Sequence, residues 1–502
     1  MDKLNKTSSL LSGLNKFEMI IILLLSVLPV AIACLYFPDF MGDDTFIHVG
    51  FIKGLIETGK FTFTGNETYG TTSPLWVILN ALFSLLTKNP ELSIRILSGV
   101  FGVITILLFN YVLKIININF SLRIFLTLSL ALNPFFIKWS ISGMEASAVM
   151  SASIMCMILL LQKKYEPSNI LGFVIGLSFL LRPEFSGVFV ISLFFFWVVK
   201  KKLSFIISFS LQFLLVITSW FIYAWTHFGT IIPNTFRAKA KDNFLSIDVD
   251  KLIRNIKVLL AGNIPEFLVI SVAVVMILFI KSKSNIKNPS SNILSFFNKQ
   301  EYILLILWIS GFYFFYILKN VTILSRYSLM FVPTIILLTA ILLNNLKTIF
   351  NQVQYNFVVG FYVIFILLLN NFITFNTIVP SNNNFANGFQ KTFKEISEII
   401  KNDNTIERKT VALTDVGIVG TYSTAKVFDL AGLVDKDRFN YNNYYDYVIA
   451  KKPIYLVLRE EADISEVVME NVQYKILYKK KVPGFGINTP EPRTVTLYKL
   501  FW

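Results

Sequence analysis

The chain has 502 residues, of which 54% are hydrophobic and only 15% are charged. Soluble globular proteins carry about 25% charged residues, so this composition excludes a soluble cytosolic enzyme. The net charge of +15 comes mainly from residues 1–380, which hold 29 basic and 16 acidic residues, whereas residues 381–502 hold 17 and 15. A basic excess confined to the apolar part indicates contact with membrane lipid and not with nucleic acid.

Apolar runs that can cross a bilayer core of roughly 30 Å recur through residues 1–380. Three lysines precede the first run and no cleavage site follows it, so we expect an uncleaved helix with a cytoplasmic N-terminus. Cys34 and Cys156 both lie in such runs and predict neither a disulfide framework nor a metal cluster. We predict about eleven spanning helices, near 17–37, 92–113, 124–139, 145–161, 169–182, 184–199, 203–224, 265–281, 301–318, 327–346 and 355–376.

The short apolar run 74–86 decides the orientation of the chain. If it lies flat as an interfacial helix, most lysines and arginines of the short connections fall on the cytoplasmic side. If it crosses, most of these connections move outside, against the positive-inside rule. We therefore predict a multi-pass protein of the plasma (inner) membrane, with an interfacial helix at 74–86 and an extracytoplasmic C-terminus.

Residues 381–502 have the pattern of a small extracytoplasmic α/β domain that follows the membrane domain 1–380. An amphipathic helix pattern over 389–400 comes first, and the Asn-rich stretch 381–387 is expected to be the linker. Five strand-like runs follow, at 411–413, 426–430, 454–458, 474–478 and 494–498.

The first outer loop begins with the adjacent carboxylates Asp43 and Asp44. Neighbouring residues of a helix point about 100° apart, so one carboxylate could accept a proton from a hydroxyl while the other orients a neighbour or binds a cation. The alternative is structural, because Asp residues favour the free N–H groups of a helix N-terminus. Ser73-Pro74, which closes this loop, is typical of a helix cap followed by proline in the first turn.

Two further outer motifs allow a structural and a functional interpretation. Ser142-Gly143-Met144-Glu145 has the spacing of a capping box, which alone would explain Glu145. Arg182-Pro183-Glu184 is typical of one helix that ends on a cation and another that starts with proline and an acid. Charged side chains at membrane depth are nevertheless candidates for a binding site.

Basic residues on the same side are candidates for phosphate recognition, to which arginine brings a bidentate fork and lysine a point charge. Arg326 precedes Tyr327 at the start of an expected helix, where extension of its side chain to the interface is the alternative. The outer stretch 233–239 carries Asn234, Arg237 and Lys239. His48 and His227 lack the spacing of metal ligands, so a histidine metal site is not expected.

Taken in order, these motifs resemble those of the bacterial GT-C glycosyltransferases, in particular the arabinofuranosyl- and mannosyltransferase-like membrane proteins. The segments that carry the resemblance are Asp43-Asp44-Thr45-Phe46, Tyr69–Trp76, Ser142–Glu145, Arg182-Pro183-Glu184, Pro233-Asn234-Thr235 with Lys239, Arg326-Tyr327, Thr414–Gly417 and Phe428–Asp435. Relatives often continue from the Asp pair into Arg-Tyr, where this chain has Val49-Gly50-Phe51 and its nearest cation is Lys53.

The resemblance implies an inverting glycosyltransferase that takes a sugar from a polyprenyl-phosphate carrier and transfers it, outside the membrane, to a glycan or lipid acceptor. Asp43, or alternatively Asp44, would be the catalytic base, and the basic residues would hold the phosphate. Glu145 and Glu184 would bind sugar hydroxyls or position those cations, and Asn234 and Tyr327 are further substrate-binding candidates. No cofactor is expected, apart from a divalent cation near the Asp pair.

Two other functions share this pattern of residues. A flippase or transporter of a lipid-linked sugar would use the same cations without chemistry, but transporters often show repeated halves, and we find no repeat. A ligase or polymerase of carrier-linked oligosaccharides would differ from the first interpretation only in the size of the donor.

Overall fold

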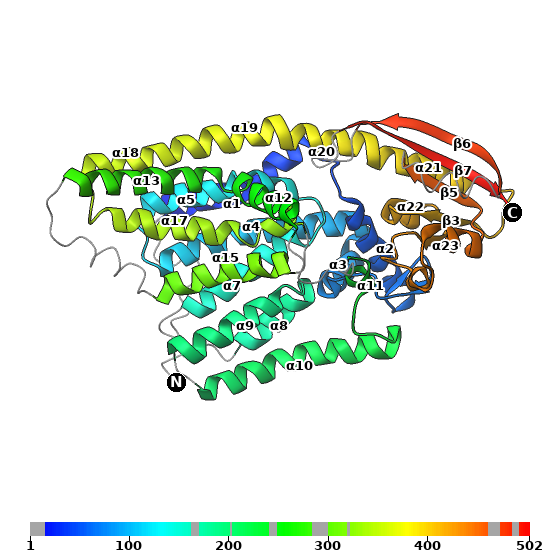
Figure 1. Cartoon of the computed structure of the whole chain (residues 1–502), viewed down its shortest axis with the longest axis horizontal. Helices are drawn as coiled ribbons and strands as arrows, with labels where there is room; N and C mark the ends of the chain where they lie inside the picture. Colours follow the sequence, from blue (N-terminus) through cyan, green and yellow to red (C-terminus); the bar gives the residue numbers. More distant parts are fainter. Residues whose placement is uncertain are drawn as a thin grey trace.

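The computed structural model of the chain describes residues 16–161, 170–200, 203–239, 248–283, 300–318, 322–459, 472–483 and 491–502. A helical bundle occupies one end of its long axis, and a smaller part built around a sheet occupies the other (Figure 1). The first half of the bundle comprises α1 (Lys16–Tyr36), α2 (Asp43–Thr58), α3 (Pro74–Thr87), α4 (Pro90–Ile115), α5 (Phe120–Ala131), α6 (Pro134–Trp139), α7 (Ala146–Leu161), α8 (Leu171–Leu181) and α9 (Phe185–Phe194), with the π-helical turn η1 (Phe195–Lys200). The second half comprises α10 (Leu203–Phe228), α11 (Asn234–Lys239), α12 (Val249–Ala261), α13 (Ile264–Lys283), α15 (Gln300–Leu318), α16 (Ser325–Ser328) and α17 (Val332–Leu346).

Several helices can cross a membrane. Among the described residues, four are long and apolar enough to do so alone: Lys16–Tyr36, Pro90–Ile115, Ser204–Phe228 and Gln352–Asn402. A fifth candidate combines α12 with Ile264–Phe279, which meet at 85°, and seven shorter apolar helices accompany these five. The helical, polytopic fold class is therefore confirmed. The total of eleven crossings and the interfacial placement of 74–86 remain predictions.

Two predicted spans prove to be broken helices. The run 124–139 divides into α5 and α6 at Asn133, whose side chain accepts the backbone N–H groups of Phe135 and Phe136 at 3.1 Å. Pro134 follows as the first residue of α6, where its missing N–H group costs nothing. The run 327–346 likewise divides into α16 and α17. Trp139 is the last residue of α6 and Tyr327 lies in the short helix α16, and both border the candidate site.

The expected linker at 381–387 is wrong, because this stretch is helical. One helical rod of 51 residues runs from Gln352 to Asn402 and joins the bundle to the C-terminal sheet (Figure 1). It consists of α18 (Gln352–Phe365), η2 (Ile366–Asn370), α19 (Asn371–Ile373), η3 (Thr374–Ile378), α20 (Val379–Phe385), η4 (Ala386–Gln390) and α21 (Lys391–Asn402). The rod packs on the end of α1 and on the loop that follows it. Asn383 Nδ2 donates to the Tyr36 carbonyl at 3.0 Å, and the ring of Phe385 contacts that of Phe40 edge-on.

The five predicted C-terminal strands are confirmed. They are β3 (Thr410–Leu413), β4 (Lys426–Asp429), β5 (Tyr455–Arg459), β6 (Gln473–Val482) and β7 (Arg493–Phe501), in the order β4-β3-β5-β7-β6. The pairs β3–β4 and β3–β5 are parallel, whereas β5–β7 and β6–β7 are antiparallel. Helix α22 (Val416–Tyr422) follows the carboxyl end of β3 and packs on α2. The turn η5 (Lys436–Asn440) and α23 (Tyr444–Lys451) precede β5.

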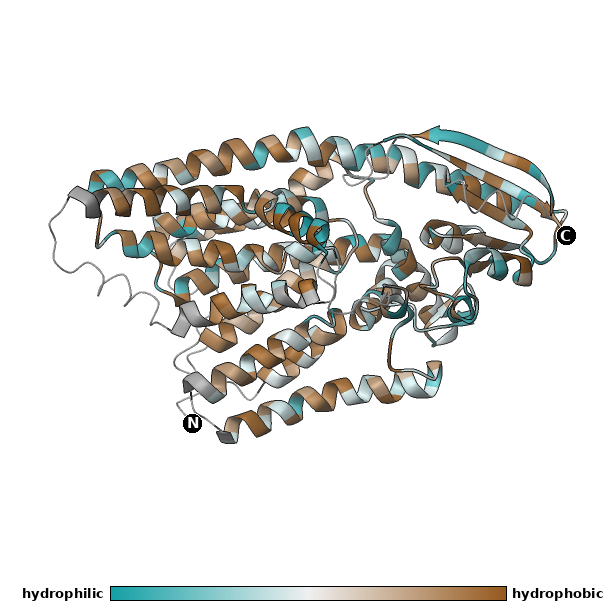
Figure 2. Ribbon diagram, in the orientation of Figure 1, coloured by the Kyte–Doolittle hydropathy of each residue, from teal (hydrophilic) through white to brown (hydrophobic). Residues whose placement is uncertain are grey.

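The distribution of hydropathy separates the two ends of the molecule. Apolar residues run along the bundle helices, whereas hydrophilic residues are frequent on the C-terminal sheet (Figure 2). Large apolar side chains are exposed on the bundle, among them Leu24 and Leu35 on α1 and Leu211 and Trp225 on α10. Exposed apolar surface of this extent requires lipid around it. The candidate residues gather where the bundle meets the C-terminal part.

Candidate active site

The first turn of α2 sends its two carboxylates to different neighbours, as expected for adjacent helical residues. Asp44 Oδ2 lies 2.5 Å from Arg326 Nη2 of α16 and forms an ion pair with it. Asp43 instead accepts the backbone N–H groups of Gly417 and Ile418, in α22, both at 3.2 Å. The Arg326 side chain is only 11% exposed, so it does not extend to the interface.

The segment 142–145 forms a tight loop against α2, and the capping box does not form. Helix α7 begins only at Ala146, and Ser142 Oγ accepts the N–H of Met144 at 3.2 Å. Gly143 has a φ of +78°, and a Cβ there would lie 2.5 Å from Thr45 Cγ2, so glycine is required. Thr45 Oγ1 in turn donates to the Ser142 carbonyl at 3.0 Å. This close approach brings Glu145 beside α2.

Glu145, Arg182 and Glu184 form one buried network. Arg182 donates to Glu145 Oε1 at 2.9 Å and to Glu184 Oε1 at 2.8 Å, and it lies between α8 and α9 as expected. His48 Nε2 approaches the other Glu145 oxygen at 3.6 Å, and Tyr316 donates to Glu184 Oε1 at 3.0 Å. The two glutamates thus hold the Arg182 guanidinium in place, in agreement with one of their expected roles.

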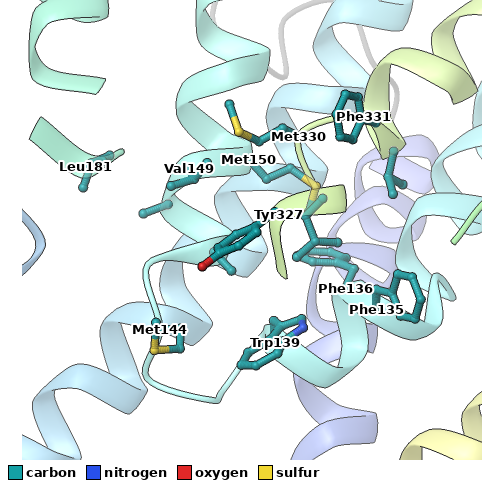
Figure 3. Close-up of a cluster of buried hydrophobic side chains, with 14 of the residues drawn as sticks. Phe135, Phe136, Trp139, Met144, Val149, Met150, Leu181, Tyr327, Met330 and Phe331 are labelled. Carbon is teal, nitrogen blue, oxygen red and sulfur yellow. The ribbon is translucent and has the colours of Figure 1, made fainter. Parts of the chain in front are cut away.

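Aromatic side chains join this network to the Asp44–Arg326 pair. The guanidinium carbons of Arg182 and Arg326 lie 4.3 and 5.1 Å from the centroid of the Tyr327 ring. The guanidinium carbon of Arg326 also lies 5.9 Å from the centroid of the Trp139 ring. The indole N–H of Trp139 donates to Ser325 Oγ at 3.0 Å. Figure 3 shows Trp139, Met144 and Tyr327 in one buried cluster. Both arginines therefore belong to one site.

The remaining candidates on α11 lie outside this cluster. Asn234 is buried and anchors α11 to the segment between α2 and α3, with Nδ2 3.0 Å from Thr68 Oγ1. Arg237 is exposed on the surface and stacks on the ring of Phe439, with its guanidinium carbon 4.8 Å from the centroid. Lys239 is the last residue of α11, and its side chain lies outside the described part of the structure. Within the described part of the chain, no hydrogen bond, ion pair or ring contact joins Asn234 or Arg237 to Arg326.

The environment of Asp43 disfavours ionisation of its carboxyl. Burial raises its pKa well above the usual value, and the negative charges of Asp415 and Asp44 raise it further. The two backbone N–H groups of Gly417 and Ile418 oppose this change. Asp44 is different because its charge is compensated by Arg326, and its side chain is 41% exposed.

The sequence analysis missed three side chains of the site: His48, Trp139 and Tyr316. His48 could have been found, because it follows Asp44 by four residues and so shares its face of α2. No sequence pattern distinguishes Trp139 and Tyr316 from the other aromatic residues of the chain, which has 49 Phe, 20 Tyr and 7 Trp. Among the described residues, no group of three or more His, Cys, Asp or Glu side chains could hold a metal ion. A divalent cation at the Asp pair therefore stays a prediction.

Comparison with solved structures finds the same fold in ArnT from Cupriavidus metallidurans. The apo structure matches with a TM-score of 0.62 at 11% identity, covering 94% of this chain and 97% of ArnT. The structure of ArnT bound to undecaprenyl phosphate matches with a TM-score of 0.57 at 12% identity, over the same shares. The chain therefore shares the fold of ArnT.

Two sequence comparisons complement this structural likeness. Residues 383–498 match a family described as a domain of unknown function, DUF8728. No curated protein matches the sequence significantly. The expected helical membrane fold with a small C-terminal sheet is thus confirmed by the likeness to ArnT, at an identity at which sequence comparison alone detects little.

Proposed function

We propose that this chain is a glycosyltransferase that moves a sugar from a polyprenyl-phosphate carrier to a glycan or lipid acceptor on the extracytoplasmic face of the membrane. The observation that carries the proposal is the Asp44–Arg326 ion pair, which joins α2 to α16 beside Arg182 and Glu145. It lies where the bundle meets the C-terminal domain, in a chain that shares the fold of ArnT, whose structure is known with undecaprenyl phosphate.

The arginines suit the departing phosphate. A polyprenyl phosphate is a good leaving group, so transfer needs cations to stabilise it more than it needs a strong acid. Arg182 and Arg326 present planar, permanently charged forks that match phosphate oxygens. Among the described atoms of the site, Arg326 Nε and Glu184 Oε2 are buried and lack a hydrogen-bond partner. Buried polar atoms of this kind are available to hydrogen-bond a ligand or water.

Asp43 is the better candidate for the base. Asp44 is already paired with Arg326, whereas burial and neighbouring acids raise the pKa of Asp43. General bases work best when their pKa approaches the working pH. In the proposed step the acceptor oxygen attacks the anomeric carbon, Asp43 takes the hydroxyl proton, and the bond to the phosphate oxygen breaks. A single displacement of this kind inverts the anomeric carbon.

The test is sugar transfer by the purified protein from radiolabelled polyprenyl-phosphate sugars. We expect the double variant Asp43→Asn, Asp44→Asn to transfer at least about 100-fold more slowly, since it loses the base and the partner of Arg326. Asp39→Asn is the matched control, because Asp39 is exposed on the same loop. Transfer that survives the double substitution contradicts the proposal. Movement of the intact lipid-linked sugar across vesicles without transfer would establish a flippase.

A further inference from the structure

The C-terminal domain contacts the proposed base directly. Both Asp43 oxygens are occupied by N–H groups of α22, one from Gly417 and one from Ile418, at 3.2 Å. Two side-chain contacts hold the same interface: Thr421 Oγ1 donates to the Phe46 carbonyl at 2.9 Å, and Lys53 Nζ donates to the Thr421 carbonyl at 3.3 Å. Helix α22 therefore lies along α2 and forms a wall of the site.

Glycine at position 417 allows this approach. A Cβ at Gly417 would lie 2.2 Å from the Asp43 carbonyl oxygen and 2.7 Å from Asp43 Oδ1. The first of these atoms belongs to the backbone and cannot rotate away, so any side chain would push α22 off α2. The direct contact between the backbone of one domain and the carboxylate of the other depends on this residue.

The charges around Asp43 come from both domains. Asp44 is paired with Arg326, and Asp415, just before α22, is paired with Arg459 of β5 at 3.2 Å. Lys394 of α21 lies over the ring of Phe46, on the next turn of α2. Two acids thus disfavour ionisation of Asp43, whereas the N–H groups of Gly417 and Ile418 favour it.

We propose that the C-terminal domain completes the catalytic centre: Gly417 and Ile418 are positioning residues whose N–H groups orient Asp43 and keep it ionised for proton transfer. This inference rests on the proposed glycosyltransferase function. It gives a role to the region that matches a family described only as a domain of unknown function. The domain is then a part of the catalytic machinery as well as a cover over the bundle.

Two substitutions should move the pH profile of kcat in opposite directions. The acid limb of that profile reports the pKa of the base in the enzyme–substrate complex. Gly417→Ala displaces both N–H donors, so Asp43 ionises less readily and the limb moves to higher pH. Asp415→Asn removes a negative neighbour, so the limb moves to lower pH. We expect shifts of about half a pH unit or more, and a fall in kcat of about tenfold for Gly417→Ala with little change in the KM of the donor.

Thr421→Val is the matched control at the same interface. It removes the hydrogen bond to Phe46 but leaves both N–H donors at Asp43, so its pH profile should match that of the wild type. Shifts of opposite sign in Gly417→Ala and Asp415→Asn, absent from Thr421→Val, support the inference. Should Gly417→Ala fail to fold, the sign of the Asp415→Asn shift decides.

The results that would contradict this inference differ from those that would contradict the proposed function. Wild-type profiles in both Gly417→Ala and Asp415→Asn, or the same shift in Thr421→Val, would overturn the role of Gly417 while sugar transfer stands. A wild-type protein that transfers no sugar from any polyprenyl-phosphate donor would overturn both proposals.

Discussion

Glu145 shows how a single buried carboxylate organises the site. It is 3% exposed and approaches both Arg182, which is 10% exposed, and His48, which is 8% exposed. Charges with so little access to water are tolerated only when they are paired and hydrogen-bonded. The loop around Gly143 and the break between α8 and α9 both serve to bring Glu145 and Arg182 together. The network is therefore structural and, as proposed, catalytic.

We expect Glu145→Gln to destabilise the folded protein by about 3–5 kcal/mol, because it leaves the Arg182 charge buried with one partner fewer. Thermal or denaturant unfolding in detergent measures the effect. Glu67→Gln is the control: Glu67 is 26% exposed and pairs with Lys60, so its loss should cost less than about 1 kcal/mol. Equal stability of the two variants would show that the Glu145 network contributes little to folding.

Charged residues of the site were predictable, whereas the aromatic residues Trp139 and Tyr316 were not. Asp44, Glu145, Arg182, Glu184 and Arg326 were expected to converge, because charges near a membrane are costly and are kept mainly for function. The same argument included Arg237, which lies outside this cluster and stacks on Phe439 at the surface. Sequence alone cannot separate a cation that pairs with a buried acid from one that packs on an exposed ring.

At the scale of elements, hydrophobic periodicity predicted the type of most helices and strands but not the continuity of the rod. Pro380 and the asparagines at 382–384 argue against a helix, since proline lacks an N–H group and asparagine is a weak helix former. The π-helical turn at Thr374–Ile378 lies directly before Pro380, and wider turns of this kind accommodate irregular hydrogen bonding. Contacts with Tyr36 and Phe40, distant in sequence, supply the rest of the stabilisation.

A continuous rod fixes the rotation of the C-terminal domain about its axis. Insertion of one alanine after Asn384 would turn everything beyond it by about 100° and displace it by about 1.5 Å. We expect this insertion to separate Gly417 from Asp43, to reduce sugar transfer at least about tenfold and to make the interface between α2 and α22 accessible to proteases. Insertion of one alanine after Gly229, beyond the end of α10, is the control. Unchanged transfer in the first variant would mean that the domain docks independently of the rod.

At the scale of the whole molecule, hydropathy differs between the two ends of the long axis. Apolar residues run along the bundle at one end, and hydrophilic residues are frequent on the sheet at the other (Figure 2). The sequence predicted this division, because the apolar runs that can cross a membrane end before residue 381. It could not predict which surface of the C-terminal domain meets the bundle, since that depends on contacts such as Gly417 with Asp43, 374 residues apart.

The predicted orientation places the C-terminal domain and the site outside the cell. Lys436 in η5 and Lys347 at the end of α17 are both exposed and belong to opposite sides in this prediction. We expect Lys436→Cys, in a chain with Cys34→Ser and Cys156→Ser, to react with a membrane-impermeant maleimide in intact cells. Lys347→Cys in the same background should react only after the membrane is opened. The reverse result would place Asp43 on the cytoplasmic side, where a carrier-linked donor on the outer leaflet could not reach it.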